Sequence, residues 1–431
     1  MIKNILHTLG TRLLTSLLSL ALLLITTQWM GAENKGAISL LVLNLSLASI
    51  FSGLFGGPSL VYLIPRLPFK HLLALNYAWS ALTAALVTGI LVGGLLPNQA
   101  NPIHFFFMAL MECLIAAHVM MLLGKVKITA HNAIALLKSA SVVGLLLYFR
   151  STGVAMDYFA FEDAYAISLI VTFLLSVGVL IYHRKAYGQQ AGSLLNSARE
   201  SLKYGFLVQV GNVAQLMNYR ISLYFIEVLI HPPTLALARI GIYSAALQVA
   251  EALWQFAKSI STVQYAAVSN LKDEEAEKGL YLSLGLGKLN YSVTAIGITL
   301  LCLLPASFYE AVLGTAFGEV RMHLLILAIG VVALSLSNAL SHYFAGIGEH
   351  RFNTYSSLFG LVLTVALSYP LISSYGTLGA AIAASITYSA QTFYQMIILK
   401  HRKDVPWSAF VVSRADLIAL SSLRRKGNRS E

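Results

Sequence analysis

Residues 241–269 read GIYSAALQVAEALWQFAKSISTVQYAAVS, a segment long and apolar enough to cross a membrane although one of its sides is polar. At about 3.6 residues per turn, its polar residues share one helix face. They are Ser244, Gln248, Glu251, Gln255, Lys258 and Thr262. A carboxylate or an ammonium at membrane depth costs about 3 kcal/mol to insert, so such groups normally face a protein interior or a wet cavity. The segment therefore predicts a polar space enclosed within the bilayer.

The composition of the whole chain agrees with a membrane protein. Of its 431 residues, 57% are hydrophobic and 11% are charged, whereas soluble domains carry about 25% charged residues. The net charge of +11 lies mainly in short loops between apolar segments, which indicates membrane orientation rather than nucleic-acid binding. Cys113 and Cys302 lie in apolar segments and form neither a disulfide framework nor a metal-ligand spacing. No metal or cofactor is predicted.

Apolar windows of about 20 residues, the length that crosses a bilayer, predict an all-α protein with twelve transmembrane helices. The windows are residues 5–30, 36–63, 72–96, 103–124, 130–150, 160–183, 203–230, 240–269, 281–304, 321–346, 353–373 and 377–400. The first is too long for a signal-peptide core and is interpreted as a retained span. Gly57 and Pro58 predict a kink near the end of the second.

The distribution of basic residues predicts the orientation of these spans. With both termini in the cytoplasm, most Lys and Arg residues of the loops and the tail fall inside, as expected for a membrane protein. The exceptions, which fall outside, are Lys35, Arg150, Arg239 and Arg321.

Two six-helix halves are the predicted domain organisation. The longest connection lies near the middle of the chain, and Gly36-x-x-Ser39 at the second span is repeated as Gly241-x-x-Ser244 at the eighth. Parallel repeats of this kind are typical of transporters. The predicted parts are an N-terminal bundle over 1–183, a cytoplasmic linker over 184–202, a C-terminal bundle over 203–400 and a basic tail over 401–431. The tail is either a short amphipathic helix on the membrane surface, starting near Ser413, or a frayed end.

Several charged residues lie within the predicted spans. They include Arg12, Glu112, Lys138, Arg220, Glu227, Glu251, Lys258 and Lys288. The surplus of cations would attract an anion, and Arg suits phosphate because its planar fork bonds two oxygens at once. A pyrophosphate head group is the natural candidate in a bilayer. Two alternatives stay open: the cations near the inner edge snorkel to the surface, or the charges form structural pairs within or between helices.

Signatures of enzymes are missing from the sequence. It contains no GxxxxGK[ST] loop, no HExxH and no paired Cys motif. A membrane polymerase or ligase would need a large extramembrane loop with catalytic groups, and no connection is long enough. A non-enzymatic transporter is therefore the main hypothesis.

Four segments of the chain carry a family resemblance. They are MGAENKG at 30–36, the run from Ile240 to Val263, the helix end and turn from Asn338 to Asn353, and YGTLGAA at 375–381. Together, and in this order, they resemble the lipid-linked oligosaccharide (O-antigen-type) flippases of the multidrug/oligosaccharidyl-lipid/polysaccharide exporter (MOP) superfamily. Twelve spans favour this branch over the fourteen-helix lipid II flippases. Arg12 stands where drug exporters of the superfamily often carry an acid.

The resemblance implies two bundles in a V around a basic cavity, and transport by alternating access. The expected substrate is a polyprenyl-pyrophosphate-linked oligosaccharide for surface polysaccharide such as the O-antigen of lipopolysaccharide, moved across a bacterial cytoplasmic (inner) membrane. The predicted substrate-binding residues are Arg12, Lys138, Arg220, Lys258, Lys288, Asn212, Gln248 and Gln255, and the predicted ion-coupling residues are Glu227 and Glu251.

The expected partners are the glycan substrate, membrane lipid and H⁺ or Na⁺, with no nucleic acid. The chain is expected to act as a monomer that can associate with glycan-assembly proteins. A cation-coupled multidrug exporter is the alternative, and it would need a cavity dominated by acids and aromatic residues.

Overall fold

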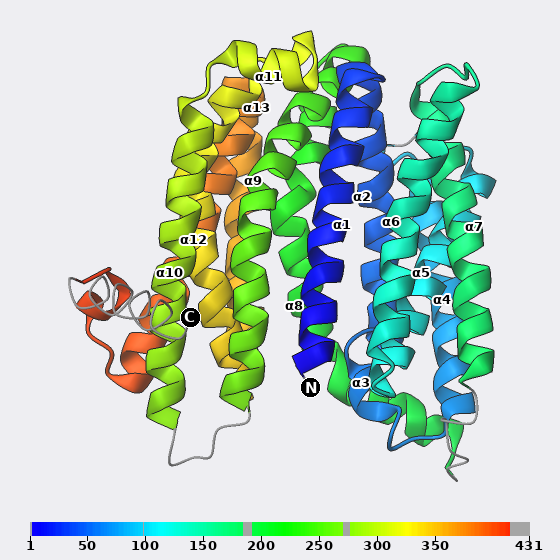
Figure 1. The fold of residues 1–431 in the computed structure, drawn as a ribbon, viewed down its shortest axis with the longest axis vertical. Helices are drawn as coiled ribbons and strands as arrows, with labels where there is room; N and C mark the ends of the chain where they lie inside the picture. Colours follow the sequence, from blue (N-terminus) through cyan, green and yellow to red (C-terminus); the bar gives the residue numbers. More distant parts are fainter. Residues whose placement is uncertain (1, 98, 184–191, 270–275, 414–431) are drawn as a thin grey trace, which may run out of the picture.

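The computed structural model shows an all-α protein whose long helices run roughly parallel to one another (Figure 1). It describes residues 2–97, 99–183, 192–269 and 276–413. Within these ranges no β-strand occurs, which confirms the predicted fold class. The predicted amphipathic tail falls almost wholly outside the described residues.

The first half of the chain supplies six membrane crossings, the second of which is broken into two helices. The helices are α1 (Ile2–Gln28), α2 (Gly31–Gly56), α3 (Ser59–Leu63), α4 (Phe69–Val92), α5 (Pro102–Gly124), α6 (Ile128–Ser151) and α7 (Tyr158–Tyr182). The break between α2 and α3 lies at Gly57 and Pro58, where the backbone of Gly57 is extended (φ −91°, ψ −155°). The predicted kink is therefore confirmed.

The second half supplies six more crossings. Its helices are α8 (Leu194–Leu229), α9 (Pro233–Ser269), α10 (Ala276–Leu303), α11 (Ala306–Leu313), α12 (Val320–Gly346) and α13 (His350–Lys403), with short 3₁₀ turns η3 (Thr315–Phe317) and η4 (Trp407–Phe410). The long α13 contains two crossings, because Gly376 adopts a non-helical conformation (φ 58°, ψ −138°) and reverses the chain. The described chain thus crosses twelve times, as predicted.

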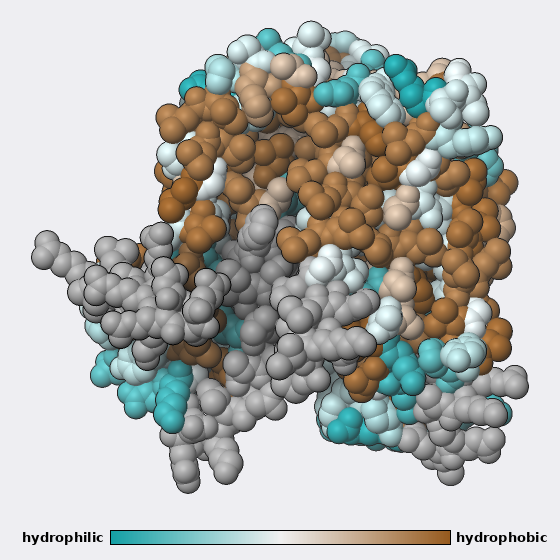
Figure 2. All heavy atoms as spheres, in the orientation of Figure 1, coloured by the Kyte–Doolittle hydropathy of each residue, from teal (hydrophilic) through white to brown (hydrophobic). Residues whose placement is uncertain are grey.

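The surface of the molecule is that of a multi-pass membrane protein. Eight of its described helical segments are long and apolar enough to cross a bilayer by length and composition. An apolar band covers the middle of the face shown in Figure 2, and hydrophilic residues gather toward its two ends. The α8 and α9 helices are absent from those eight, since polar residues interrupt them.

One predicted loop is wrong. The segment from Gly31 to Lys35 was expected to be a loop, but α2 begins at Gly31. Gly31 takes a positive φ of 79°, and the Asn34 side chain donates to the Met30 carbonyl (2.9 Å), so the turn after α1 is very short. The expected linker is also partly helical. Its residues from Leu194 onward belong to α8, whose first turn is capped by the Ser193 hydroxyl.

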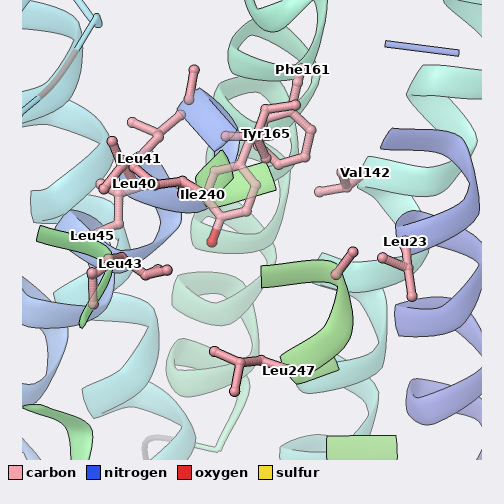
Figure 3. Packing of buried hydrophobic residues seen from close by; sticks show 14 of the residues in the cluster. Leu23, Leu40, Leu41, Leu43, Leu45, Val142, Phe161, Tyr165, Ile240 and Leu247 are labelled. Carbon is pink, nitrogen blue, oxygen red and sulfur yellow. The ribbon is translucent and has the colours of Figure 1, made fainter. Parts of the chain in front are cut away.

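The α2 helix lies at the centre of the molecule and packs against α4, α5, α8 and α9. Figure 3 shows Leu40, Leu41, Leu43 and Leu45 of α2 close to Ile240 of α9, in one continuous core. Because helices in lipid gain little from apolar contact alone, close packing decides which spans associate. Close packing therefore associates α2 of the first half with α9 of the second half.

The contact between α2 and α9 is closest at the upper end of the molecule in Figure 1, and it is reciprocal. A Cβ atom on Gly36 would clash with the carbonyl oxygen of Leu237, and one on Gly241 would clash with that of Ala32. Each glycine thus lies against the residue four positions before the other. Ser39 Oγ and Ser244 Oγ, one turn further along each helix, are 2.8 Å apart. The repeated Gly-x-x-Ser pattern therefore forms a contact with local two-fold character.

Below this contact, two pairs of helices join the halves unequally. The α2–α8 pair is tied along its length, because Tyr224 donates to Asn44 Oδ1 (2.6 Å), Gln209 donates to the Ile50 carbonyl, and Gly205 packs against Leu54. The α1–α9 pair packs less extensively, and the two helices diverge toward the lower end in Figure 1. The space enclosed on this side is the candidate site.

Candidate substrate cavity

A cavity of about 710 Å³ lies between α1, α2, α6, α7, α8 and α9. Its wall includes apolar side chains such as Leu23, Val42 and Phe161. Ten hydroxyl and amide side chains also line it: Thr11, Thr15, Ser16, Ser19, Thr26, Ser39, Ser46, Asn132, Ser244 and Gln248. A wall of mixed character suits a ligand with both sugar-like hydroxyls and an apolar part.

The polar face of α9 contributes one wall of the cavity. Ser244, Gln248 and Glu251 all line it, as the spacing of the sequence predicts. The side chains of Gln255 and Lys258 lie outside the described residues.

A charge pair joins α8 to α9 at the cavity wall. The Arg220 guanidinium donates to Glu251 Oε2 at 2.8 Å and lies 2.7 Å from Glu251 Oε1. The two side chains are 24% and 20% exposed, so the pair is largely shielded from solvent. Because one guanidinium nitrogen approaches both carboxylate oxygens, other N–H groups of Arg220 can still bind a second anion.

Lys35 is a cavity residue that the sequence interpretation assigned to an outside loop. It lies on the second turn of α2, is 3% exposed, and its Nζ donates to Gln248 Oε1 on α9 (3.2 Å). The signal that could have revealed it is its spacing: Lys35, Ser39 and Ser46 fall on one face of α2.

The polar face of α1 forms another part of the cavity wall. Thr15 and Ser19 donate to the backbone carbonyls four residues before them (2.9 Å each). Such bonds satisfy the hydroxyl hydrogens within the helix and leave the oxygens able to accept a bond from a ligand. The backbone of Arg12 lies on this helix next to Thr11, while its side chain lies outside the described residues.

Four predicted site residues are not among the described residues that line the cavity: Asn212, Lys138, Lys288 and Glu227. The Lys138 ammonium bonds Glu112 on α5 at 2.6 Å, and Tyr165 also donates to this carboxylate (3.4 Å). Asn212 and Lys288 are half-buried on α8 and α10. Glu227 lies near the upper end of α8, with one buried carboxylate oxygen that has no hydrogen-bond partner among the described residues.

The electrostatics of the cavity favour an anion. Its described lining carries two cations, Lys35 and Arg220, against one carboxylate, Glu251, and also includes His131. Within the described ranges, no group of three or more His, Cys, Asp or Glu residues could hold a metal ion. The charges of the described lining therefore suit an anionic ligand.

Known proteins share the architecture around this cavity. No protein-family model matches the sequence. A multidrug resistance MATE family transporter of the MOP superfamily, solved in an inward-facing conformation, aligns with a TM-score of 0.66 at 14% identity, over 93% of this chain and 98% of that one. The lipid II flippase MurJ, in an inward closed conformation, aligns with a TM-score of 0.62 at 13% identity, over 99% and 93%. This chain has the fold of a MOP-superfamily transporter.

Two further likenesses are relevant to the MOP fold. A MOP superfamily transporter from Pyrococcus furiosus, described as having a binding pocket of reverse polarity that suggests a different function, aligns with a TM-score of 0.55 at 12% identity over 95% of each chain. An uncharacterized membrane protein of Methanocaldococcus jannaschii is 29% identical over 148 residues. The match covers about a third of the length of that curated relative (34%). These likenesses establish the fold, and the substrate has to be argued from the cavity.

Proposed function

We propose that the protein is a flippase that moves a polyprenyl-pyrophosphate-linked oligosaccharide from the inner to the outer leaflet for surface polysaccharide biosynthesis. The observation that carries the proposal is the excess of cations over carboxylates in a cavity otherwise lined by hydroxyls and amides. Cations suit the diphosphate, since charge-assisted bonds to phosphate are about twice as strong as neutral ones. The hydroxyls and amides suit a sugar.

The unequal contacts between the halves support a lipid-linked ligand. The α1–α9 pair packs less extensively than α2–α8, and both α1 and α9 line the cavity. The described outer face of α1 is apolar, with Leu13, Leu17 and Leu24 exposed. A polyprenyl tail can therefore stay in the membrane beside α1 while the diphosphate occupies the cavity.

The multidrug exporter is the competing proposal within the same fold. It needs carboxylates and aromatic rings to hold an organic cation. The described lining offers Phe161 as an aromatic residue and Glu251 as a carboxylate, and Glu251 already pairs with Arg220. The polarity of the cavity therefore favours the anionic substrate.

The orientation and the site follow the same proposal. The lower end in Figure 1, where α1 begins and α13 ends, faces the cytoplasm of a bacterium, since most of the basic loops lie there. The contact of Gly36 with Gly241 then closes the outside end. Arg12, Lys258 and Gln255 are proposed to join Lys35, Arg220 and Gln248 in binding. Glu251 is the proposed coupling group for H⁺ or Na⁺, because it lines the cavity and Glu227 does not.

A reconstitution experiment tests the proposal. The purified protein is placed in liposomes that contain a polyprenyl-pyrophosphate-linked oligosaccharide, and exposure of the sugar to an added, membrane-impermeant glycosidase is followed over time. The flippase proposal predicts faster exposure than in protein-free liposomes. If exposure of the sugar is unchanged while the same liposomes transport the organic cation ethidium, the flippase proposal is refuted in favour of the drug exporter. Disruption of the gene should also trap the lipid-linked sugar on the inner leaflet.

A further inference from the structure

Lys35 is the residue that the structure adds to the proposed binding residues. Its side chain is 3% exposed yet borders the cavity. Among the described residues, no carboxylate lies within 4.0 Å of its ammonium. A buried ammonium without a counter-ion is costly. Such a group indicates a site that an anion completes.

The hydrogen bond that Lys35 donates joins the two halves of the protein. Its acceptor is Gln248 Oε1 on α9, 3.2 Å away. The same pair of helices carries the Gly36–Gly241 contact and the hydrogen bond between Ser39 and Ser244. The Lys35–Gln248 bridge therefore adds to the contact that holds the upper ends of α2 and α9 together.

An anion in the cavity would compete with Gln248 for Lys35. A phosphate oxygen accepts a stronger bond from an ammonium than a neutral amide oxygen does. If the ammonium moves to the phosphate, the α2–α9 contact loses one of its polar bonds across the two halves. The anion then favours the state in which this contact is open, because it binds that state better.

We propose that Lys35 binds a phosphate oxygen of the lipid-linked diphosphate, and that its transfer from Gln248 to the phosphate loosens the upper contact between α2 and α9. The inference rests on the proposed function for the identity of the substrate. It identifies Lys35 as the group through which the substrate promotes opening of the outer end.

Cysteine cross-linking measures the state of this contact. The pair Ser39→Cys and Ser244→Cys is introduced, because the two hydroxyl oxygens are 2.8 Å apart. The buried native thiols are removed by Cys113→Ala and Cys302→Ala. Disulfide formation is followed in liposomes with farnesyl diphosphate, with farnesol as the neutral lipid, and with inorganic pyrophosphate as the free anion.

Farnesyl diphosphate should slow cross-linking by about tenfold, the effect of one charge-assisted hydrogen bond on an equilibrium. Farnesol should leave the rate unchanged. Lys35→Gln should abolish the response to farnesyl diphosphate, and Lys35→Arg should retain it because the charge remains. Gln248→Glu should raise cross-linking and weaken the response, since a carboxylate competes better with the phosphate.

Three results would overturn the inference: no effect of farnesyl diphosphate, an equal effect of farnesol, or a full response in Lys35→Gln. A response to pyrophosphate without one to farnesyl diphosphate would refute the lipid headgroup as the source of the anion. If the cysteine pair prevents folding, thermal stabilisation by farnesyl diphosphate replaces cross-linking, and Lys35→Gln should lose it. The proposed function has a separate test in the translocation assay. If the glycan is not translocated while farnesyl diphosphate still slows cross-linking, the oligosaccharide is refuted as the substrate and the role of Lys35 is retained.

Discussion

The α2–α8 and α1–α9 pairs occupy corresponding places in the two predicted repeats, yet they differ in how firmly they join the halves. In α2–α8, Tyr224 bonds Asn44, and Gln209 bonds the backbone of Ile50. In α1–α9, described polar side chains of both helices, such as Thr15 and Gln248, line the cavity. Corresponding helix pairs thus give a closely packed α2–α8 side, called the closed side, and a less extensively packed α1–α9 side, called the open side.

The difference shows which contacts between the two halves are the weaker ones. At the upper end, Gly36 and Gly241 make equivalent contacts with the opposite half. Below it, the described α1 hydroxyls of Thr15 and Ser19 bond their own backbone. The α1–α9 pair packs less extensively than the α2–α8 pair, so the α2–α8 side is the firmer connection between the halves.

The largest expected effect comes from the charge pair on the open side. Arg220→Ala should lower the free energy of unfolding by about 3 kcal/mol, because it leaves the Glu251 carboxylate without its partner in a shielded site. Translocation should also fall by at least about tenfold. Thermal unfolding in detergent and the liposome assay measure the two effects.

The double variant Arg220→Ala/Glu251→Ala provides the control for this prediction. It should recover much of the lost stability but not the translocation, since the unpaired carboxylate is gone while the cation is still missing. Recovery of both properties would remove Arg220 from the substrate site.

The next effect tests the upper contact that the two sides share. Gly36→Ala places a Cβ against the Leu237 carbonyl, and Gly241→Ala places one against Ala32. Each should lower the free energy of unfolding by about 2 kcal/mol, the usual cost of overpacking.

Gly178→Ala on α7 is the matched control for these glycine variants. A Cβ at this position meets nothing within 4 Å, so the variant should keep or slightly raise the stability, by about 0.5 kcal/mol. If Gly36→Ala behaves like Gly178→Ala in thermal unfolding, the α2–α9 contact is not closely packed.

A smaller effect tests the closed side. Tyr224→Phe removes the bond to Asn44, whose side chain is fully buried, and should cost about 1 kcal/mol in unfolding free energy. Tyr148→Phe on α6 changes an exposed ring (61%) and should have no measurable effect in the same thermal scan. Equal behaviour of the two variants would show that the α2–α8 bond contributes nothing.

The smallest effect concerns the polar face of α1. Thr15→Val keeps the shape of the side chain but removes a cavity hydroxyl, so translocation should fall by about threefold, as expected for one neutral hydrogen bond. Stability should change by less than about 0.5 kcal/mol. Thr88→Val on α4 removes the same kind of backbone bond (2.7 Å) away from the cavity. Equal translocation by both variants would argue against a substrate contact at Thr15.

Much of the fold could be predicted because its signals are local. Hydropathy gave twelve crossings, Gly57 and Pro58 marked a break, and the spacing of Ser244, Gln248 and Glu251 defined a cavity face. The errors arose where position along the chain was misleading. Lys35 stands five residues after the end of an apolar run, so it was assigned to water, whereas α2 begins early enough to bury it.

The charges show the same limit more sharply. In the sequence, Arg220 lies seven residues from Glu227, and Glu251 lies seven from Lys258, a spacing that allowed pairs within one helix as well as between helices. The structure instead pairs Arg220 with Glu251, across two helices. It also pairs Lys138 with Glu112, on α6 and α5. Neither partnership could be chosen from spacing alone.

The sequence by itself determined that this chain crosses a membrane twelve times and that α9 presents a polar face within the bilayer. Hydrophobic length and helical period fix these properties residue by residue. Only the tertiary structure decided that Lys35 meets Gln248, that Arg220 meets Glu251, and that one side of the molecule is closed while the other is open. Most of the spans are apolar, so hydrophobicity alone cannot select their partners, and close packing and polar contacts between helices must do so.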